Sequence, residues 1–184
     1  MPRAEEEQVI LVDDQDRAIG AAPKLAAHRE GRLHRAISVQ LRDDSGRLLL
    51  QKRHIGKYHS GGLWTNTCCS HPRPGEEVHS AAQRRLTEEM NISCPLTHLF
   101  TTRYCAVVDN GMTEHELVHC FGGLYAGNIR PDPKEADGYA WMDLDELRQE
   151  VDLAPARYSL WFRIYLRDHW TEITGSVSQH LPGT

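Results

Sequence analysis

Cys69 and His71 lie two residues apart in the run from Trp64 to Pro72, which reads Trp-Thr-Asn-Thr-Cys-Cys-Ser-His-Pro. In an extended strand, residues separated by two point to the same face, so a thiol and an imidazole could share one pocket. The same spacing in Glu114-His115-Glu116 brings two carboxylates together. A thiol, an imidazole and paired carboxylates predict acid–base chemistry beside a metal ion.

Two further histidines, His28 and His34, precede this run. With His71, Glu114 and Glu116 they offer imidazole and carboxylate ligands, which suit Mn²⁺, Zn²⁺ or Mg²⁺, and the share of nitrogen favours the first two. A single histidine is more often a surface or core residue. The predicted metal site therefore depends on the whole set.

The segment from Ser70 to Ile92 has the spacing of a Nudix box, which runs glycine, five residues, glutamate, seven residues, then Arg-Glu-aliphatic-x-Glu-Glu-x-Gly-aliphatic. Such a box clusters carboxylates on one helix face, where they suit Mg²⁺ beside a diphosphate. Here Ser70, Arg85 and Asn91 replace glycine, glutamate and glycine. Because Arg85 removes one acidic ligand, the scaffold could be kept without the metal cluster of a hydrolase.

The alternative interpretation of the same segment is a solvated helix. Arg84 and Glu88, and likewise Arg85 and Glu89, stand four residues apart and could form ion pairs along one helix face. The spacing alone leaves both interpretations open.

The elements that must position these groups are short and mixed. Strands are expected at residues 8–12, 36–41, 47–51, 99–108, 117–125 and 138–142, and helices at 23–29, 78–90, 144–150 and 159–170. Residues 64–69 are expected to form a short strand or an extended loop. Strands and helices intermix without a regular βαβ alternation. This order predicts an α+β fold, or a mixed sheet between helices.

The composition fits one domain over residues 1–184, with 1–7 and 175–184 expected to be loosely ordered. A net charge of −5 argues against a nucleic-acid binder. No apolar run approaches the roughly 18 residues of a membrane span. Five cysteines without an export signal favour reduced thiols in the cytoplasm.

Several strings occur in order along the chain: His28…Leu33-His34-Arg35-Ala36, the run from Leu63 to Pro72, Gly75-Glu76, Glu114-His115-Glu116 and Tyr158-Ser159-Leu160-Trp161. Together they resemble the type 1 isopentenyl-diphosphate delta-isomerases, which are Nudix-fold enzymes. The resemblance runs from about residue 8 to residue 161, and its Trp-Thr-Asn-x-x-Cys-x-His-Pro string is highly specific. It implies a Nudix-like mixed β-sheet flanked by helices.

The resemblance also implies a reaction, the interconversion of isopentenyl diphosphate and dimethylallyl diphosphate in isoprenoid biosynthesis. Protonation of the terminal alkene carbon gives a tertiary carbocation, which then loses a proton from the carbon nearer the diphosphate. An alkene is a very poor base, so a strong acid in a dry site is needed. By resemblance, Cys69 and Glu116 flank the substrate, Tyr104 assists Glu116, and Trp161 faces the cation.

The ligand sets are likewise those that the resemblance implies. One Mn²⁺ or Zn²⁺ is expected at His28, His34, His71, Glu114 and Glu116. A substrate-bound Mg²⁺ is expected at Glu89 and the Cys69 backbone carbonyl. The diphosphate is expected at Lys24, Arg53, Lys57 and either Arg84 or Arg85.

Further expectations concern what the protein does not bind. No flavin is expected, because the flavin-dependent isomerase of this reaction is a barrel that needs about 200 residues or more. The expected partner is a small prenyl diphosphate, with no nucleic acid and no membrane insertion, and the protein is expected to be a monomer or weak dimer.

Two rival functions remain open from the sequence. A Nudix-type diphosphate hydrolase would share the fold and the metals, but Arg85, Cys69 and Glu116 argue against it. A binding domain with a structural metal would not require a thiol placed beside the ligands.

Overall fold

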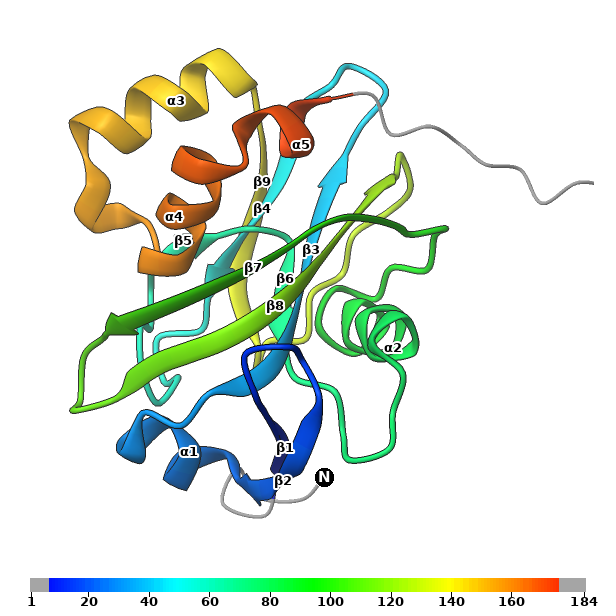
Figure 1. Cartoon of the computed structure of the whole chain (residues 1–184). Coiled ribbons are helices and arrows are strands. Elements are labelled where there is room, and N and C mark those ends of the chain that lie inside the picture. Colours follow the sequence, from blue (N-terminus) through cyan, green and yellow to red (C-terminus); the bar gives the residue numbers. More distant parts are fainter. Residues whose placement is uncertain (1–6, 176–184) are drawn as a thin grey trace, which may run out of the picture.

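The computed structural model describes residues 7–175, and a mixed β-sheet lies at its centre (Figure 1). The central strand β3 (His34–Arg42) pairs in parallel with β8 (Thr113–Leu124) and antiparallel with β1 (Gln8–Val12), β4 (Leu48–Arg53) and β6 (Cys68–Ser70). Four more strands extend the sheet. The strand β2 (Ala18–Pro23) pairs with β1, and β7 (Thr97–Val107) pairs with β8. Both β5 (Trp64–Thr65) and β9 (Ala136–Met142) pair with β4.

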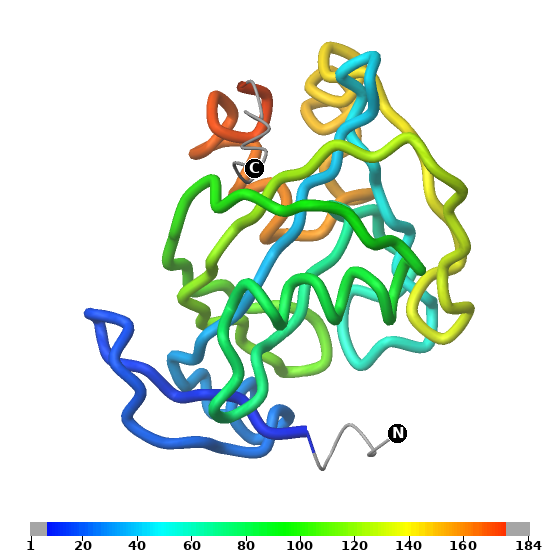
Figure 2. The backbone as a smooth tube through the Cα atoms, turned by 90° about the vertical axis from the view of Figure 1, so that its right-hand side faces the viewer, coloured from blue at the N-terminus to red at the C-terminus, as the bar shows by residue number. Residues whose placement is uncertain are grey.

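Helices cover both faces of this sheet. On one face packs α2 (Val78–Met90), and on the other lie α3 (Leu144–Leu153), the short 3-10 helix η1 (Pro155–Arg157), α4 (Leu160–Asp168) and α5 (Trp170–Thr174). The N-terminal strands and α1 (Lys24–Glu30) gather at one end of the molecule and the C-terminal helices at the other, as the rotated view in Figure 2 also shows.

Two apolar cores follow from the alternation of side chains along the strands. On β4, Leu48 and Leu50 belong to the core under α4, together with Phe162, whereas Leu49 belongs to the core under α2, together with Leu86. All five side chains are almost fully buried. Because both faces of β4 are covered at this point, its sequence there is a continuous apolar run, Leu48-Leu49-Leu50.

Most of the predicted elements are confirmed, including the α+β class and the helix at 78–90. Asp143 caps α3 as expected for an N-cap residue, because its Oδ1 accepts hydrogen bonds from the backbone N–H groups of Asp145 at 2.9 Å and Glu146 at 3.4 Å. The expectation of loose order for 1–6 and 176–184 lies outside the described residues.

Three local predictions are corrected. The strand expected at 117–125 begins earlier, at Thr113, so the two site carboxylates lie within β8. The short strand β2 was not anticipated, and most of its side chains are exposed. The helix expected at 159–170 is broken at His169, whose ring stacks on Phe100 with centroids 3.9 Å apart. Tertiary packing therefore overrides a continuous helical pattern at that point. Within residues 7–175, no helix is long and apolar enough to cross a membrane.

The core under α2 provides a direct test of the packing. Leu86→Ala removes a buried side chain and is expected to lower the free energy of unfolding by about 2–5 kcal/mol, measured by urea denaturation. The matched control Leu153→Ala, on the exposed end of α3, is expected to change it by less than about 0.5 kcal/mol. Equal losses in the two variants would contradict this packing.

Candidate active site

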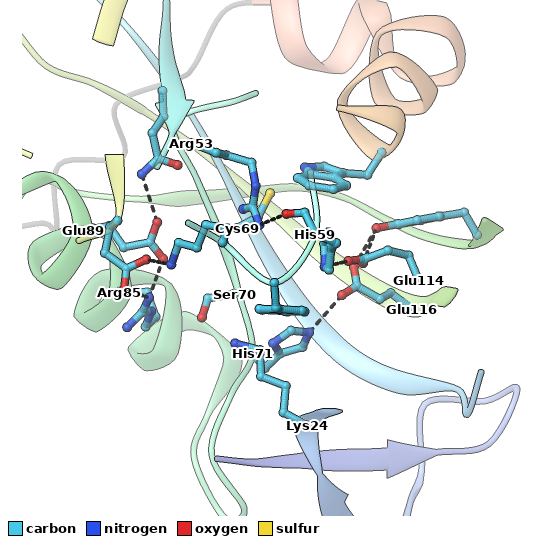
Figure 3. Close-up of a pocket in the computed structure, with 16 residues that line it drawn as sticks. Lys24, Arg53, His59, Cys69, Ser70, His71, Arg85, Glu89, Glu114 and Glu116 are labelled. Carbon is cyan, nitrogen blue, oxygen red and sulfur yellow. Dashed lines mark hydrogen bonds and ion pairs between the residues drawn. The ribbon is translucent and has the colours of Figure 1, made fainter. Parts of the chain in front are cut away.

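A polar pocket opens beside the central strand, and side chains from α1, α2, α4 and the loop after β4 line it (Figure 3). Figure 3 shows Glu114 and Glu116 on one side of Cys69, and Arg85 with Glu89 on the other. The pocket is lined by Lys24, Gln51, Arg53, Lys57, Tyr58, His59, Cys69, Ser70, His71, Arg85, Glu89, Tyr104, Glu114, Glu116, Glu135 and Trp161.

The short strand β6 presents the thiol of Cys69 to this pocket. Its antiparallel pairing sets Cys69 opposite Ser38 on β3. Cys68, one residue earlier, points to the other face and packs in the core under α2. The Cys69 Sγ donates a hydrogen bond to Asn66 Oδ1 at 3.0 Å and lies 3.5 Å from Ser38 Oγ. These contacts fix the thiol without pairing it with a charged group.

The environment of Cys69 keeps its proton in place. Burial raises the pKa of the thiol to about 12, against a smaller opposing effect of the hydrogen bonds with Ser38 and Asn66. At neutral pH the side chain is therefore a neutral thiol that can carry a proton.

Glu114 and Glu116 project from β8 on the same face, as the two-residue spacing predicts. The β7–β8 register sets Tyr104 opposite Glu116. The Tyr104 hydroxyl donates to Glu116 Oε2 at 2.8 Å and lies 3.2 Å from Glu114 Oε2. On the other side, His71 Nε2 lies 2.9 Å from Glu116 Oε1. The structure thus brings the predicted tyrosine, histidine and carboxylates together.

His28 and His34 lie beneath the pocket and are fully buried. The Nδ1 atom of His28 bonds the Lys24 carbonyl, and that of His34 bonds the Arg32 carbonyl, each at 2.8 Å. Their Nε2 atoms have no hydrogen-bond partner among residues 7–175. A buried polar atom without a partner is costly, and this arrangement of imidazoles is typical of metal ligands.

The donor set fits a divalent cation. One possible ligand atom from each of His28, His34, His71 and Glu116 lies within 4.8 Å of the others. Burial lowers the pKa values of His28 and His71, which favours the neutral imidazoles that metals bind. The pKa of His34 is raised, because its contact with Glu116 outweighs the effect of burial. Burial alone would raise the pKa of Glu116, but its contact with His34 outweighs this and brings it to about 2. The carboxylate is therefore ionised.

Trp161 forms the pocket wall contributed by α4 and is almost fully buried. The guanidinium of Arg53, at the end of β4, lies over its ring with Cζ 5.0 Å from the ring centroid. This distance is typical of a cation–π contact, so the indole ring is suited to face a positive charge.

Each of three basic side chains in the pocket is paired with a carboxylate. Lys24 Nζ lies 2.9 Å from Glu7 Oε2, Lys57 pairs with Glu135, and Arg85 Nη2 lies 2.7 Å from Glu89 Oε1. The other oxygen of Glu89 accepts a hydrogen bond from Gln51 at 3.1 Å. The pocket thus combines cations for an anionic ligand with carboxylates that hold those cations in place.

The two arginines that the sequence left as alternatives have different surroundings. Arg85 lines the pocket, whereas Arg84 bonds Glu76 at 2.7 Å and Glu88 at 3.1 Å on the neighbouring surface. Both ion pairs of the alternative interpretation, Arg84–Glu88 and Arg85–Glu89, are present. The second is not a solvated pair, because Glu89 is buried.

Sequence reasoning missed several residues of the pocket, which are Gln51, Tyr58, His59 and Glu135. His59 is one of eleven histidines, and its spacing to the other candidate ligands gave no signal. Glu135 reaches Arg85 from the segment before β9, at 3.4 Å, and only the fold brings the two together.

The fold and the site place the chain in a known class. The NUDIX domain family matches residues 32–162. The crystal structure of DR0079 from Deinococcus radiodurans superposes with a TM-score of 0.73 at 18% identity, covering 89% of this chain and 99% of that one, which supports the fold alone. The protein thus contains a Nudix domain.

Sequence relatives narrow this class. Isopentenyl-diphosphate Delta-isomerase 2 of Aromatoleum aromaticum is 52% identical over 156 residues, which cover 85% of this chain and 82% of the relative. Isopentenyl-diphosphate Delta-isomerase of Pectobacterium atrosepticum is 45% identical over 175 residues, covering 94% of this chain and 98% of the relative. The chain belongs to the isopentenyl-diphosphate Delta-isomerase family.

The buried histidines lead to a prediction about metal-dependent stability. Mn²⁺ or Zn²⁺ at about 100 times its Kd is expected to raise the free energy of unfolding by about 2.7 kcal/mol in the unaltered protein. His34→Ala is expected to remove most of this increment at the same ion concentration, because it deletes a buried ligand. Urea unfolding with and without the ion measures both values. The control His98→Ala, on an exposed part of β7, should keep the increment, and an unchanged increment in His34→Ala would contradict the site.

Proposed function

We propose that this pocket interconverts isopentenyl diphosphate and dimethylallyl diphosphate by protonation and deprotonation, in isoprenoid biosynthesis. Membership of the isomerase family supports the activity. The observation that carries the chemistry is that a thiol, Cys69, and a carboxylate, Glu116, line one pocket. Burial raises the pKa of the thiol, and the contact of Glu116 with His34 lowers the pKa of the carboxylate. A hydrolase has no evident need for this pair.

Cys69 and Glu116 are proposed to serve the two faces of the substrate. One of them delivers a proton to the terminal alkene carbon, and the other removes a proton from the carbon nearer the diphosphate. Because the reaction is reversible, each acts as an acid in one direction and as a base in the other. Tyr104 donates to Glu116 at 2.8 Å and is proposed to assist its proton transfer.

The intermediate is proposed to face Trp161. A tertiary carbocation needs an electron-rich surface that does not react with it, and the indole ring offers one. The guanidinium of Arg53 lies over this ring in the structure. The ring itself is almost fully buried and so lies away from bulk water.

The metal ligands are proposed to be His28, His34, His71, Glu114 and Glu116 for one Mn²⁺ or Zn²⁺, with Glu89 and the Cys69 carbonyl for a substrate-bound Mg²⁺. When bound, the first ion would act as a Lewis acid on its carboxylate ligands, and Mg²⁺ would neutralise diphosphate charge. Lys24, Arg53, Lys57 and Arg85 are proposed to bind the diphosphate.

The Nudix hydrolase alternative has less support. The Nudix domain is also the fold of these isomerases, so the match at 32–162 does not favour hydrolysis. Arg85 occupies the position of a box glutamate and pairs with Glu89. We further infer a cytoplasmic enzyme, monomeric or weakly dimeric, that acts on a small prenyl diphosphate and uses neither flavin nor nucleic acid.

Proton NMR tests the activity directly. Isopentenyl diphosphate is incubated with the protein, Mn²⁺ or Zn²⁺, and Mg²⁺ in deuterated water. Dimethylallyl diphosphate carrying deuterium in a methyl group is expected, because the protonating group exchanges with solvent. Unchanged substrate with a folded, metal-loaded protein would overturn the proposal, and phosphate release from a nucleotide panel would favour the hydrolase.

The role of the thiol is tested by neighbouring cysteines. Cys69→Ala is expected to lower kcat by about 10²–10⁴-fold, because it removes a proton-transferring group from the pocket. Cys68→Ala, at the adjacent thiol in the core under α2, is expected to retain activity while losing some stability. Steady-state kinetics and urea denaturation of both variants give the comparison. Equal kcat values in the two variants would contradict the assignment.

The two arginines give a second kinetic comparison. Arg85→Ala is expected to raise KM for the diphosphate substrate by about tenfold or more, because a charge-assisted bond inside the pocket is lost. Arg84→Ala removes ion pairs on the neighbouring surface and is expected to change KM by about twofold at most. A larger effect at Arg84 would reverse this choice.

A further inference from the structure

We propose that His59, on the loop between β4 and β5, is a fourth imidazole ligand of the metal site and binds the ion through Nε2. The proposal rests on the metal site of the proposed function and adds a ligand to it. The resemblance implies only His28, His34 and His71 as histidine ligands.

His59 shares the hydrogen-bonding pattern of two of those histidines. In His28 and His34 the Nδ1 atom bonds a backbone carbonyl and Nε2 is left over. In His59, Nδ1 lies 3.2 Å from Ser60 Oγ, and Nε2 has no hydrogen-bond partner within the described part of the chain. The side chain is 2% exposed, so water does not readily satisfy this nitrogen. A ring held through one nitrogen, with the other buried and without a hydrogen bond, is prepared for a metal.

The contact between His59 and Glu114 also points to an ion. Nε2 of His59 lies 2.7 Å from Glu114 Oε1, yet the pair lacks the alignment of a hydrogen bond. Two ligand atoms about 2.1 Å from one ion at a right angle would lie about 3 Å apart. The spacing therefore fits two neighbouring ligands of one metal.

The two groups of possible ligands meet at His28. One contains His28, His34, His71 and Glu116, and the other contains His28, His59 and Glu114. Because Nδ1 of His28 bonds the Lys24 carbonyl, only Nε2 is available to either group. One nitrogen lone pair binds one ion, so a metal held by His28 Nε2 would be shared by the two groups. His59 and Glu114 belong to the same group, so both would bind the ion that His28 holds.

The surrounding contacts hold His59 in place from both sides. Its carbonyl accepts a hydrogen bond from Arg53 Nη2 at 3.2 Å, and its ring packs edge-on against Trp161 with centroids 5.7 Å apart. The next residue is tied to the β7–β8 turn, because the Ser60 N–H donates to Asp109 Oδ1 at 2.8 Å. A bond between His59 and the metal would therefore connect the metal site to the loop that carries Lys57, a proposed diphosphate contact.

Proton NMR of the Co²⁺-loaded protein in ordinary water counts the histidine ligands. Each imidazole bound through one nitrogen keeps an N–H on the other, and the paramagnetic ion shifts that resonance far from the usual range. Four such exchangeable resonances are expected in the unaltered protein, three in His59→Gln and four in His54→Gln, a control at a partly exposed histidine of the same loop. His59→Gln is also expected to bind Co²⁺ at least about tenfold more weakly.

Three resonances in the unaltered protein would overturn the proposal, whether or not His59→Gln folds. The same count in the unaltered protein and in folded His59→Gln would overturn it as well, and would leave His59 as a group that only orients Glu114. Failure of this proposal is distinct from failure of the proposed function. If three imidazoles bind the ion and the product still carries deuterium, only the fourth ligand is wrong and the isomerase activity stands. A protein that binds no Co²⁺ would overturn both the fourth ligand and the metal site.

Discussion

The register between the parallel strands β3 and β8 is the constraint on which the site depends. It sets His34 beside Glu116, and the neighbouring β7–β8 register sets Tyr104 opposite the same carboxylate. Side chains alternate along a strand, so a slip of one residue would turn Glu114 and Glu116 away from this face. The backbone hydrogen bonds that hold the sheet therefore also assemble the proposed acid–base groups.

A group of buried polar side chains lies next to the apolar core under α4. His28, His34, Glu114 and Glu116 are buried, and the core under α4 lies beside them. Burying imidazole and carboxylate groups is unfavourable unless each finds a partner. Tyr104 and His71 satisfy part of this need for Glu116, and a divalent ion would satisfy the remaining nitrogens. The buried polar cluster therefore needs the proposed metal, because without it the Nε2 atoms would stay buried without partners.

The helix α2 shows how a Nudix scaffold can be used differently. Where the box would place a glutamate, Arg85 turns into the pocket and holds Glu89 and Glu135. This exchange replaces one negative charge by a positive one beside the site. The paired carboxylates keep this arginine oriented toward the pocket, where it is proposed to bind the diphosphate. The same geometry limits how freely Glu89 can serve Mg²⁺, since both of its oxygens already accept hydrogen bonds.

The sequence by itself determined the residue types and their local order. The two-residue spacing of Cys69 with His71 and of Glu114 with Glu116 predicts shared faces, and the helix at 78–90 follows from its apolar period. Such signals are local, because side-chain direction depends on the residue's own strand or helix. Only the tertiary structure decided that Arg85 and not Arg84 lines the pocket, and that His59 and Glu135 belong to it. Those placements depend on strand register and loop contacts between segments distant along the chain, which no local pattern encodes.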